Sequence, residues 1–140
     1  MSADQRGYSR MGVLRSMSTL LHSDITEKII RASFDVHNSL GKGLVEKTYE
    51  NALCVKLRKL GLKVEQQKCL PVIFEDQNVG EQIVDLVVEN LVVVEIKAVH
   101  SLSRTHESQI LGYLKNTKFE LGLLINFGDR VEFKRFIYSY

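Results

Sequence analysis

The stretch that decides the fold runs from Gln82 to Lys97 and has the sequence QIVDLVVENLVVVEIK. It contains two apolar runs, Gln82–Val88 and Leu91–Ile96, whose length and valine content predict β-strands. The polar pair Glu89-Asn90 between them is typical of a tight turn, so the two runs are predicted to form an antiparallel hairpin. Strands this apolar belong in the core of the protein.

Three charged residues interrupt this apolar stretch: Asp85 in the first run, and Glu95 and Lys97 at the end of the second. Charges in strands bound for a core are costly unless they are paired or bind a metal. Glu95 and Lys97 are two residues apart, so they point to the same face of their strand.

Whether Asp85 joins that face depends on the hairpin register. A two-residue loop, Glu89-Asn90, would pair Asp85 with Val94 and turn it to the wrong face. A three-residue loop, Val88–Asn90, would pair it with Val93 and place it diagonally across from Glu95. Asn90 would then take the left-handed position of the loop, which asparagine tolerates well. A common site therefore requires the three-residue loop.

The chemistry suits these residue types. Two carboxylates, Asp85 and Glu95, can hold a hard cation such as Mg²⁺ or Mn²⁺, which polarises a phosphoryl oxygen and lowers the pKa of a bound water. Lys97 can orient that water and stabilise developing negative charge. A buried Asp–Lys or Glu–Lys ion pair without a catalytic role explains the same spacing, and spacing alone leaves both interpretations open.

Two helices are predicted before this hairpin. The first begins at Asp24, with Glu27 completing a capping-box pattern, and ends at Gly41. The second covers residues 45–60 and ends at Gly61, and Glu46 shares the apolar face of this helix. The segment Lys63–Phe74 is predicted to be a strand at the edge of the sheet or a bulged strand, because Pro71 cannot donate to a ladder.

After the hairpin, the pattern predicts a helix over Thr105–Lys115 and strands over Leu121–Asn126 and Val131–Tyr138. A strand, a helix and a strand in that order favour a parallel crossover. The predicted order is ααβββαββ. The fold class is therefore α/β, with a mixed sheet flanked by helices.

Composition restricts the class of protein further. The chain has 140 residues, 44% of them hydrophobic, which is enough for one core. Its net charge of +2 permits binding to a polyanion without predicting it. The two cysteines, Cys54 and Cys69, have neither disulfide-framework nor zinc-site spacing, so an intracellular location is expected. No run is long and apolar enough for a membrane span.

Residues 1–23 are set apart from the fold. Arg6, Arg10 and Arg15, with several serines, resemble the composition of an organelle targeting segment. A disordered leader, or a true start at Met11 or Met17, explains this composition as well. The folded domain is expected to span residues 24–140.

Five motifs in order resemble a known family. The segment Gly43–Tyr49 matches the GxxExxY signature of the GxxExxY protein family, a branch of the PD-(D/E)xK nuclease-like superfamily. The segments Asp85–Val88, Glu95–Ala98, Gln109–Lys115 and Gly122–Gly128 are similar to that family too. The superfamily's usual proline before the first aspartate is replaced here by Val84.

The resemblance implies a restriction-endonuclease-like core and a role for each matched residue. Asp85, Glu95 and Glu46 correspond to metal ligands, Lys97 to the catalytic lysine, and Gln109 and Tyr113 to a helix element that lines the site. We therefore expect a Mg²⁺-dependent nuclease that acts on DNA or RNA. The alternative is a catalytically weak or inactive domain that binds nucleic acid or assembles with proteins. Homodimerisation, and cytoplasmic, nuclear or organellar location, are left open.

Overall fold

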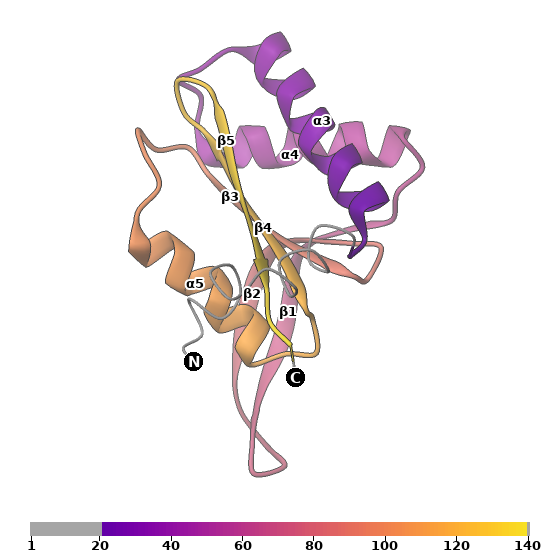
Figure 1. Cartoon of the computed structure of the whole chain (residues 1–140), viewed down its shortest axis with the longest axis vertical. Coiled ribbons are helices and arrows are strands. Elements are labelled where there is room, and N and C mark those ends of the chain that lie inside the picture. The colour runs from indigo at the N-terminus through magenta and orange to yellow at the C-terminus, as the bar shows by residue number, and fades with distance from the viewer. Residues whose placement is uncertain (1–20, 140) are drawn as a thin grey trace.

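The computed structural model describes residues 21–139, in which three helices and five strands follow one another in the predicted order (Figure 1). Residues 1–20, where a leader or targeting segment was predicted, lie outside the described residues. The elements are α3 (Ser23–Leu40), α4 (Glu46–Lys59), β1 (Val64–Phe74), β2 (Gln77–Val88), β3 (Val92–Lys97), α5 (Arg104–Lys115), β4 (Leu121–Phe127) and β5 (Val131–Ile137).

The five strands form one mixed sheet in the order β1-β2-β3-β4-β5. The pairs β1–β2, β2–β3 and β4–β5 are antiparallel, whereas β3 and β4 are parallel and are connected through α5. A parallel pair needs a crossover of this kind. The α/β class, the mixed sheet and the position of β1 at an edge are therefore confirmed.

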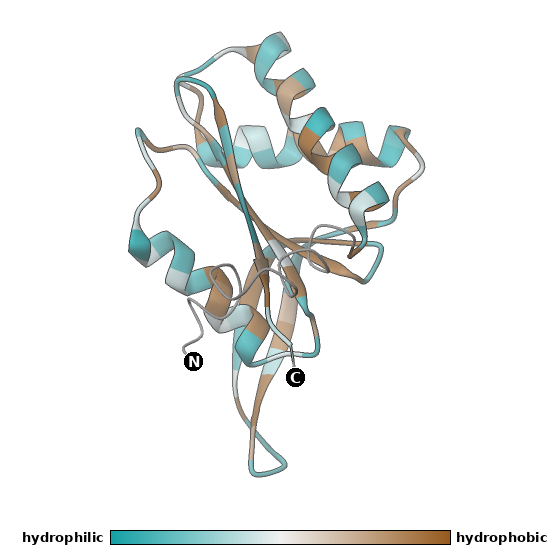
Figure 2. Cartoon of the chain, in the orientation of Figure 1, coloured by the Kyte–Doolittle hydropathy of each residue, from teal (hydrophilic) through white to brown (hydrophobic). Residues whose placement is uncertain are grey.

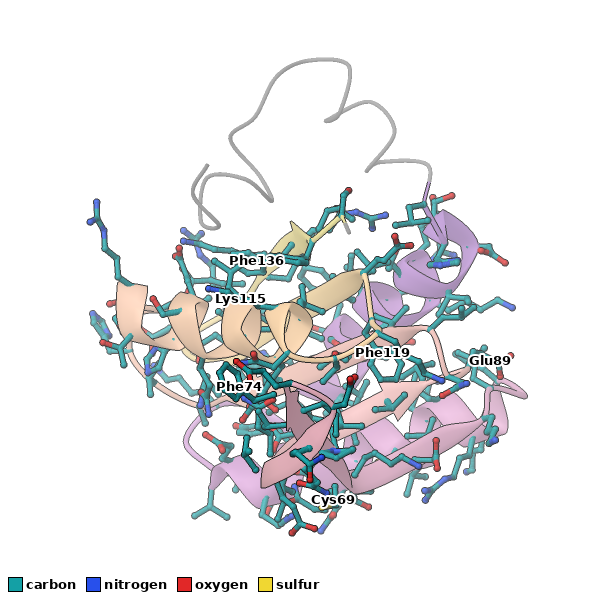
Figure 3. The ribbon with its side chains drawn as sticks, turned by 90° about the horizontal axis from the view of Figure 1, so that it is seen from below. Cys69, Phe74, Glu89, Lys115, Phe119 and Phe136 are labelled. Atoms are coloured by element: carbon teal, nitrogen blue, oxygen red, sulfur yellow. The ribbon has the colours of Figure 1, made fainter. Side chains whose placement is uncertain are left out.

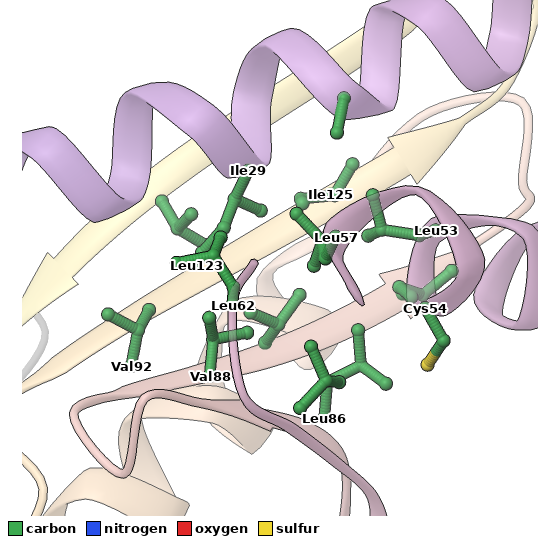
Figure 4. Close-up of a cluster of buried hydrophobic side chains, with 14 of the residues drawn as sticks. Ile29, Leu53, Cys54, Leu57, Leu62, Leu86, Val88, Val92, Leu123 and Ile125 are labelled. Carbon is green, nitrogen blue, oxygen red and sulfur yellow. The ribbon is translucent and has the colours of Figure 1, made fainter. Parts of the chain in front are cut away.

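Helices cover both faces of the sheet. Helices α3 and α4 lie together on one face and α5 lies on the other, so the core has two layers (Figure 1). Apolar side chains of α3, α4, β2, β3 and β4 fill the first layer (Figure 4). Figure 2 shows brown, apolar residues concentrated where the helices meet the sheet. No helix within residues 21–139 has the length and apolar character needed to cross a membrane.

The N-cap of the first helix lies two residues earlier than the capping pattern predicted. This N-cap is His22, with no side-chain capping bond, and Asp24 lies in the first turn. The prediction of Asp24 as N-cap was therefore wrong, because a residue inside the helix cannot accept in the way a cap does. An acidic side chain in the first turn still interacts favourably with the helix dipole. The predicted end at Gly41 is confirmed, with φ of 80°.

The loop between β2 and β3 has three residues, as a common site requires, but it is shifted by one position. Val88 stays paired with Val92, so the loop is Glu89-Asn90-Leu91 instead of Val88–Asn90. Glu89 and Asn90 both have φ of 54°, and the left-handed position predicted for Asn90 is confirmed. Because Leu86 pairs with Val94, continuing the register brings Asp85 opposite Glu95 and not opposite Val93.

The outer part of the β1–β2 hairpin projects away from the helices (Figure 1). Its turn, Glu75-Asp76, has φ values of 48° and 66°. Ile73, Phe74 and Val79 near this turn are exposed. Figure 3 views the molecule from below, with Phe74 labelled and α5 lying across the middle of the view. The projecting hairpin contributes edge surface rather than core.

Candidate active site

Asp85 of β2 and Glu95 of β3 lie side by side at the point where the β2–β3 ladder ends. The amide of Asp85 donates to Oε2 of Glu95 (2.9 Å), and the amide of Ile96 donates to Oδ2 of Asp85 (2.8 Å). Each carboxylate thus accepts from the backbone of the opposite strand. At this position, bonds from a backbone amide to a carboxylate replace the bonds from amide to carbonyl that a regular β-ladder would have.

The alternation of side chains between the two faces of the sheet is interrupted in β2 at Asp85. Val84 packs in the α5-side layer, whereas Leu86 packs in the layer under α3 and α4. Residues two apart in a regular strand would share a face. The residue opposite Asp85 in β1, Gln67, has φ of 53°, in the left-handed region. Both strands are therefore irregular at this position, and irregularities of this kind re-aim side chains.

A chain of polar contacts connects Lys97 to α5 and back to β2. Nζ of Lys97 donates to Oε1 of Gln109 (2.9 Å), and Nε2 of Gln109 donates to Oη of Tyr113 (3.0 Å). Tyr113 in turn donates to the carbonyl of Ile83 (3.3 Å). Gln109 and Tyr113 share a helix face, as their spacing of four predicted. Lys97 is therefore held beside the two carboxylates by a neighbouring helix.

Glu46 is the first residue of α4, three residues before the buried Tyr49, and its side chain is exposed at the end of the helix. Burial raises the pKa of Glu46, and the charges of Lys97 and Asp85 also act on that pKa, in opposite directions. Glu46 therefore borders the Asp85–Glu95–Lys97 group from the end of the helix.

The carboxylate that α4 does bury is Glu50, which the sequence reasoning missed. Glu50 is 2% exposed and accepts hydrogen bonds from Lys47 (3.1 Å), Gln66 (2.6 Å) and Gln67 (3.0 Å). The side chain of Gln67 also donates to Oδ1 of Asp85 (3.3 Å), so it bridges the two carboxylates.

A signal for Glu50 was present in the sequence. Glu50, Cys54 and Leu57 are spaced as i, i+4 and i+7, and all three are buried. An acid on such a stripe indicates a buried carboxylate with polar partners. The partners themselves, in β1, could not be identified from local spacing.

The environment of Glu95 favours its protonated form. Burial, followed by the nearby charge of Asp85, raises the pKa of Glu95 to about 8. Burial also raises the pKa of Asp85, although the amide of Ile96 opposes this. Lys97 lowers the pKa of both groups. A buried carboxyl group, Glu95, and a half-buried one, Asp85, share a single nearby lysine, and a bound cation would favour the deprotonated form of both.

The donor set suits a hard divalent cation. Carboxylate oxygens of Asp85 and Glu95 are the ligands that Mg²⁺ prefers, and Glu46 lies close enough to interact with Asp85 through its charge. Within residues 21–139, no three acidic, histidine or cysteine side chains are grouped as a complete metal cage. Mg²⁺ commonly keeps several waters and takes further oxygens from substrate phosphates, so two protein carboxylates fit this mode of binding.

Two comparisons with known proteins identify the family and the fold. The family model described as the PD-(D/E)XK nuclease superfamily matches residues 23–136, so the chain belongs to that superfamily. The crystal structure of SSO0001 is similar in fold, with a TM-score of 0.53 and 18% sequence identity. The match covers 68% of this chain and about half, 51%, of that one. A search of curated proteins found no match.

Proposed function

We propose that this chain is a Mg²⁺-dependent nuclease that hydrolyses phosphodiester bonds in DNA or RNA. The observation that carries the proposal is the pairing of Asp85 and Glu95 at the end of the β2–β3 ladder, with Lys97 two residues further along β3. Membership of the nuclease superfamily supports it. Mn²⁺ would be expected to substitute for Mg²⁺, because it accepts the same oxygen ligands.

Asp85 and Glu95 would hold the cation directly, with Glu46 approaching it from the start of α4 as the third proposed ligand; the cation, when bound, would act as a Lewis acid on a phosphoryl oxygen and lower the pKa of a coordinated water. The raised pKa of Glu95, about 8, means that this carboxyl must lose its proton before it can act as a ligand. Metal binding is therefore expected to release protons near neutral pH.

Lys97 would orient the attacking water and stabilise the negative charge that develops on the phosphate. Its ammonium group is held by Gln109, which is itself bonded to Tyr113. Asp85 would be positioned by Gln67, whose amide group is anchored on the buried Glu50. These supporting contacts keep the reacting groups in a narrow range of positions, as catalysis requires.

The alternative function is a nuclease-like module with weak or no catalysis that binds nucleic acid or assembles with other proteins. One observation favours it: Asp85 and Glu95 each already accept a backbone hydrogen bond, and Lys97 bonds to Gln109. Groups engaged in this way can serve a purely structural role. Against it, no ion pair joins Lys97 to either carboxylate among residues 21–139.

The two functions are separated by metal binding and by cleavage, measured on the same variants. We would titrate Mg²⁺ and Mn²⁺ by calorimetry into wild type, D85N, E95Q and K97M, and then assay each on single- and double-stranded DNA and RNA. K59M, which changes an exposed lysine of α4, is the matched control for K97M.

We expect D85N and E95Q to lose both metal binding and cleavage. K97M should retain metal binding and lose at least about a hundredfold in rate, the size typical of a single catalytic group. If wild type and K59M cleave none of the four substrates with either metal, the nuclease proposal fails and the binding module is favoured.

A further inference from the structure

A groove of about 400 Å³ is formed by three links between elements, and one of these links directly follows Lys97 in the chain. These links are the α3–α4 link, the β3–α5 link and the β4–β5 turn, which come together at the upper left of Figure 1. The groove contains Leu44, two residues before Glu46, and Ala98, directly after Lys97. Two of its walls are therefore continuous with chain that carries proposed site residues.

The groove also occupies a favoured place in the topology. β3 and β4 are the parallel pair of the sheet, and Ala98 and Phe127 mark their carboxyl ends. In open α/β sheets, ligands bind in the crevice outside the carboxyl ends of such strands. A volume of about 400 Å³ is within the usual range for a small-molecule site.

Buried side chains hold each of the three walls in place. Tyr49, fully buried, donates to the carbonyl of Gly41 (2.6 Å) and accepts from the amide of Leu44 (3.2 Å). Asn126, also fully buried, bonds to both the amide and the carbonyl of Val99, each at 2.9 Å. This anchoring leaves both walls little freedom to move.

The third wall is fixed at Gly128. His37 of α3 donates to its carbonyl (2.9 Å), and the ring of Tyr49 stacks on that of Phe127 at 4.7 Å. A Cβ at Gly128 would lie 2.6 Å from the carbonyl oxygen of Val99, so only glycine fits there. The motif residues Tyr49, Asn126 and Gly128, which have no part in the metal chemistry proposed above, therefore all shape this groove.

The groove surface combines polar and apolar groups. Leu44, which is 40% exposed, and Val99 provide an apolar wall, whereas Lys42 and His100 provide nitrogen donors. Lys42 and Asp129 form an exposed ion pair across the groove at 3.6 Å, and such pairs are weak. A phosphate could therefore displace Asp129 from Lys42 at little cost.

We propose that this groove binds one nucleotide of the strand being cut, next to the phosphate that is hydrolysed. The base or sugar lies against Leu44 and Val99, and a flanking phosphate contacts Lys42 and His100. The groove thus positions the strand so that the neighbouring phosphate reaches Asp85, Glu95 and Lys97. This inference rests on the proposed function for its catalytic meaning, but binding of a nucleotide can be measured without catalysis.

The test is a titration of the ¹⁵N-labelled full chain in EDTA, which prevents cleavage. Deoxyadenosine 5′-monophosphate and adenosine 5′-monophosphate are the probes, and inorganic phosphate is the control ligand. We expect amide shifts at Gly43, His100 and Gly128 with either nucleotide. A comparison of the affinities for the two nucleotides also shows whether the groove discriminates DNA from RNA.

Three variants make the test specific. K42A/H100A should weaken nucleotide binding about tenfold through lost charge-assisted contacts, and L44A about threefold through lost apolar contact. K28A is the matched control, because Lys28 lines a second cavity of about 420 Å³ between α3 and α4. K28A should leave the affinity unchanged.

Three results would overturn the inference. Amide shifts confined to the surroundings of Lys97 and Gln109 would show that the nucleotide binds outside the groove, and they would not contradict the proposed nuclease function. Equal affinity for inorganic phosphate and nucleotide would show that the groove binds only an anion. The absence of any amide shift would exclude nucleotide binding. Because metal is absent throughout, a chain that cleaves nothing still gives a clear answer.

Discussion

At the scale of single residues, the molecule brings carboxyl groups together at a cost in stability. Glu95 is 3% exposed and faces Asp85, and the deprotonated form of each group is disfavoured by burial. Gln67 and Glu50 reduce the freedom of Asp85 without neutralising it. Such local strain is common where a fold retains groups for function instead of stability.

This cost predicts the sign of the pH dependence of stability. Glu95 has an ordinary pKa of 4.5 and a pKa of about 8 in the fold, so the folded chain holds the proton more tightly than the unfolded chain. The free energy of unfolding should therefore fall as pH rises from about 5 to about 8, with a limiting slope near 1.4 kcal/mol per pH unit. Urea unfolding at a series of pH values, without metal, measures it.

The control for this prediction is E95Q, which cannot ionise and keeps the shape of the side chain. E95Q should therefore flatten the slope between pH 5 and pH 8. An equal slope in wild type and E95Q would show that Glu95 does not carry the raised pKa.

At the scale of elements, replacing glycine by alanine is expected to have opposite effects on stability inside a helix and in a turn between strands. A Cβ at Gly112, inside α5, would meet no atom within 4 Å, whereas a Cβ at Gly128 would meet the carbonyl of Val99 at 2.6 Å. The first glycine costs α5 conformational entropy, and the second lets the β4–β5 turn lie against the β3–α5 link.

We expect G112A to stabilise the fold by about 0.5–1 kcal/mol, because alanine is the better helix former. G128A should destabilise it by about 1–3 kcal/mol, because backbone must shift to relieve the overlap. Thermal and urea unfolding of both variants measures the two effects. A neutral G128A would mean that the link near Val99 moves freely, which would also weaken the case for a rigid groove.

At the scale of the whole molecule, the projecting end of the β1–β2 hairpin is separate from the core. Ile73 and Phe74 are 55% and 62% exposed, whereas Leu86 in the same pair of strands is fully buried. We expect I73S/F74S to change the free energy of unfolding by no more than about 0.5 kcal/mol. L86A should lower it by about 2–5 kcal/mol.

The same I73S/F74S variant tests the homodimer that the sequence left open. Exposed apolar side chains on an edge hairpin are a surface through which copies can associate. Sedimentation of wild type and variant over a range of concentrations measures this directly. A dimer that dissociates in I73S/F74S but not in a matched V55S variant, which changes an exposed valine of α4, would locate the interface on the hairpin.

Local patterns in the sequence were sufficient for the elements and their order. The period of the apolar residues, the end of the first helix at Gly41 and the edge position of the strand that contains Pro71 each depend on a few neighbouring residues, and they were predicted correctly. The second helix ends at Lys59 with Leu60 as its C-cap, one residue before the predicted Gly61. The shared face of Gln109 and Tyr113 follows from helix geometry alone. The three-residue length of the β2–β3 loop followed from requiring Asp85 and Glu95 to share a face.

Only the tertiary structure decided the features that depend on distant segments. Its register placed Asp85 opposite Glu95, two residues from the predicted partner Val93, because Val88 stays in the ladder. It buried Glu50, whose partners Gln66 and Gln67 lie in β1. It also joined three separate links into one groove. The sequence by itself therefore determined which charged groups stand in the apolar strands, because their spacing is local, and long-range packing determined how those groups meet.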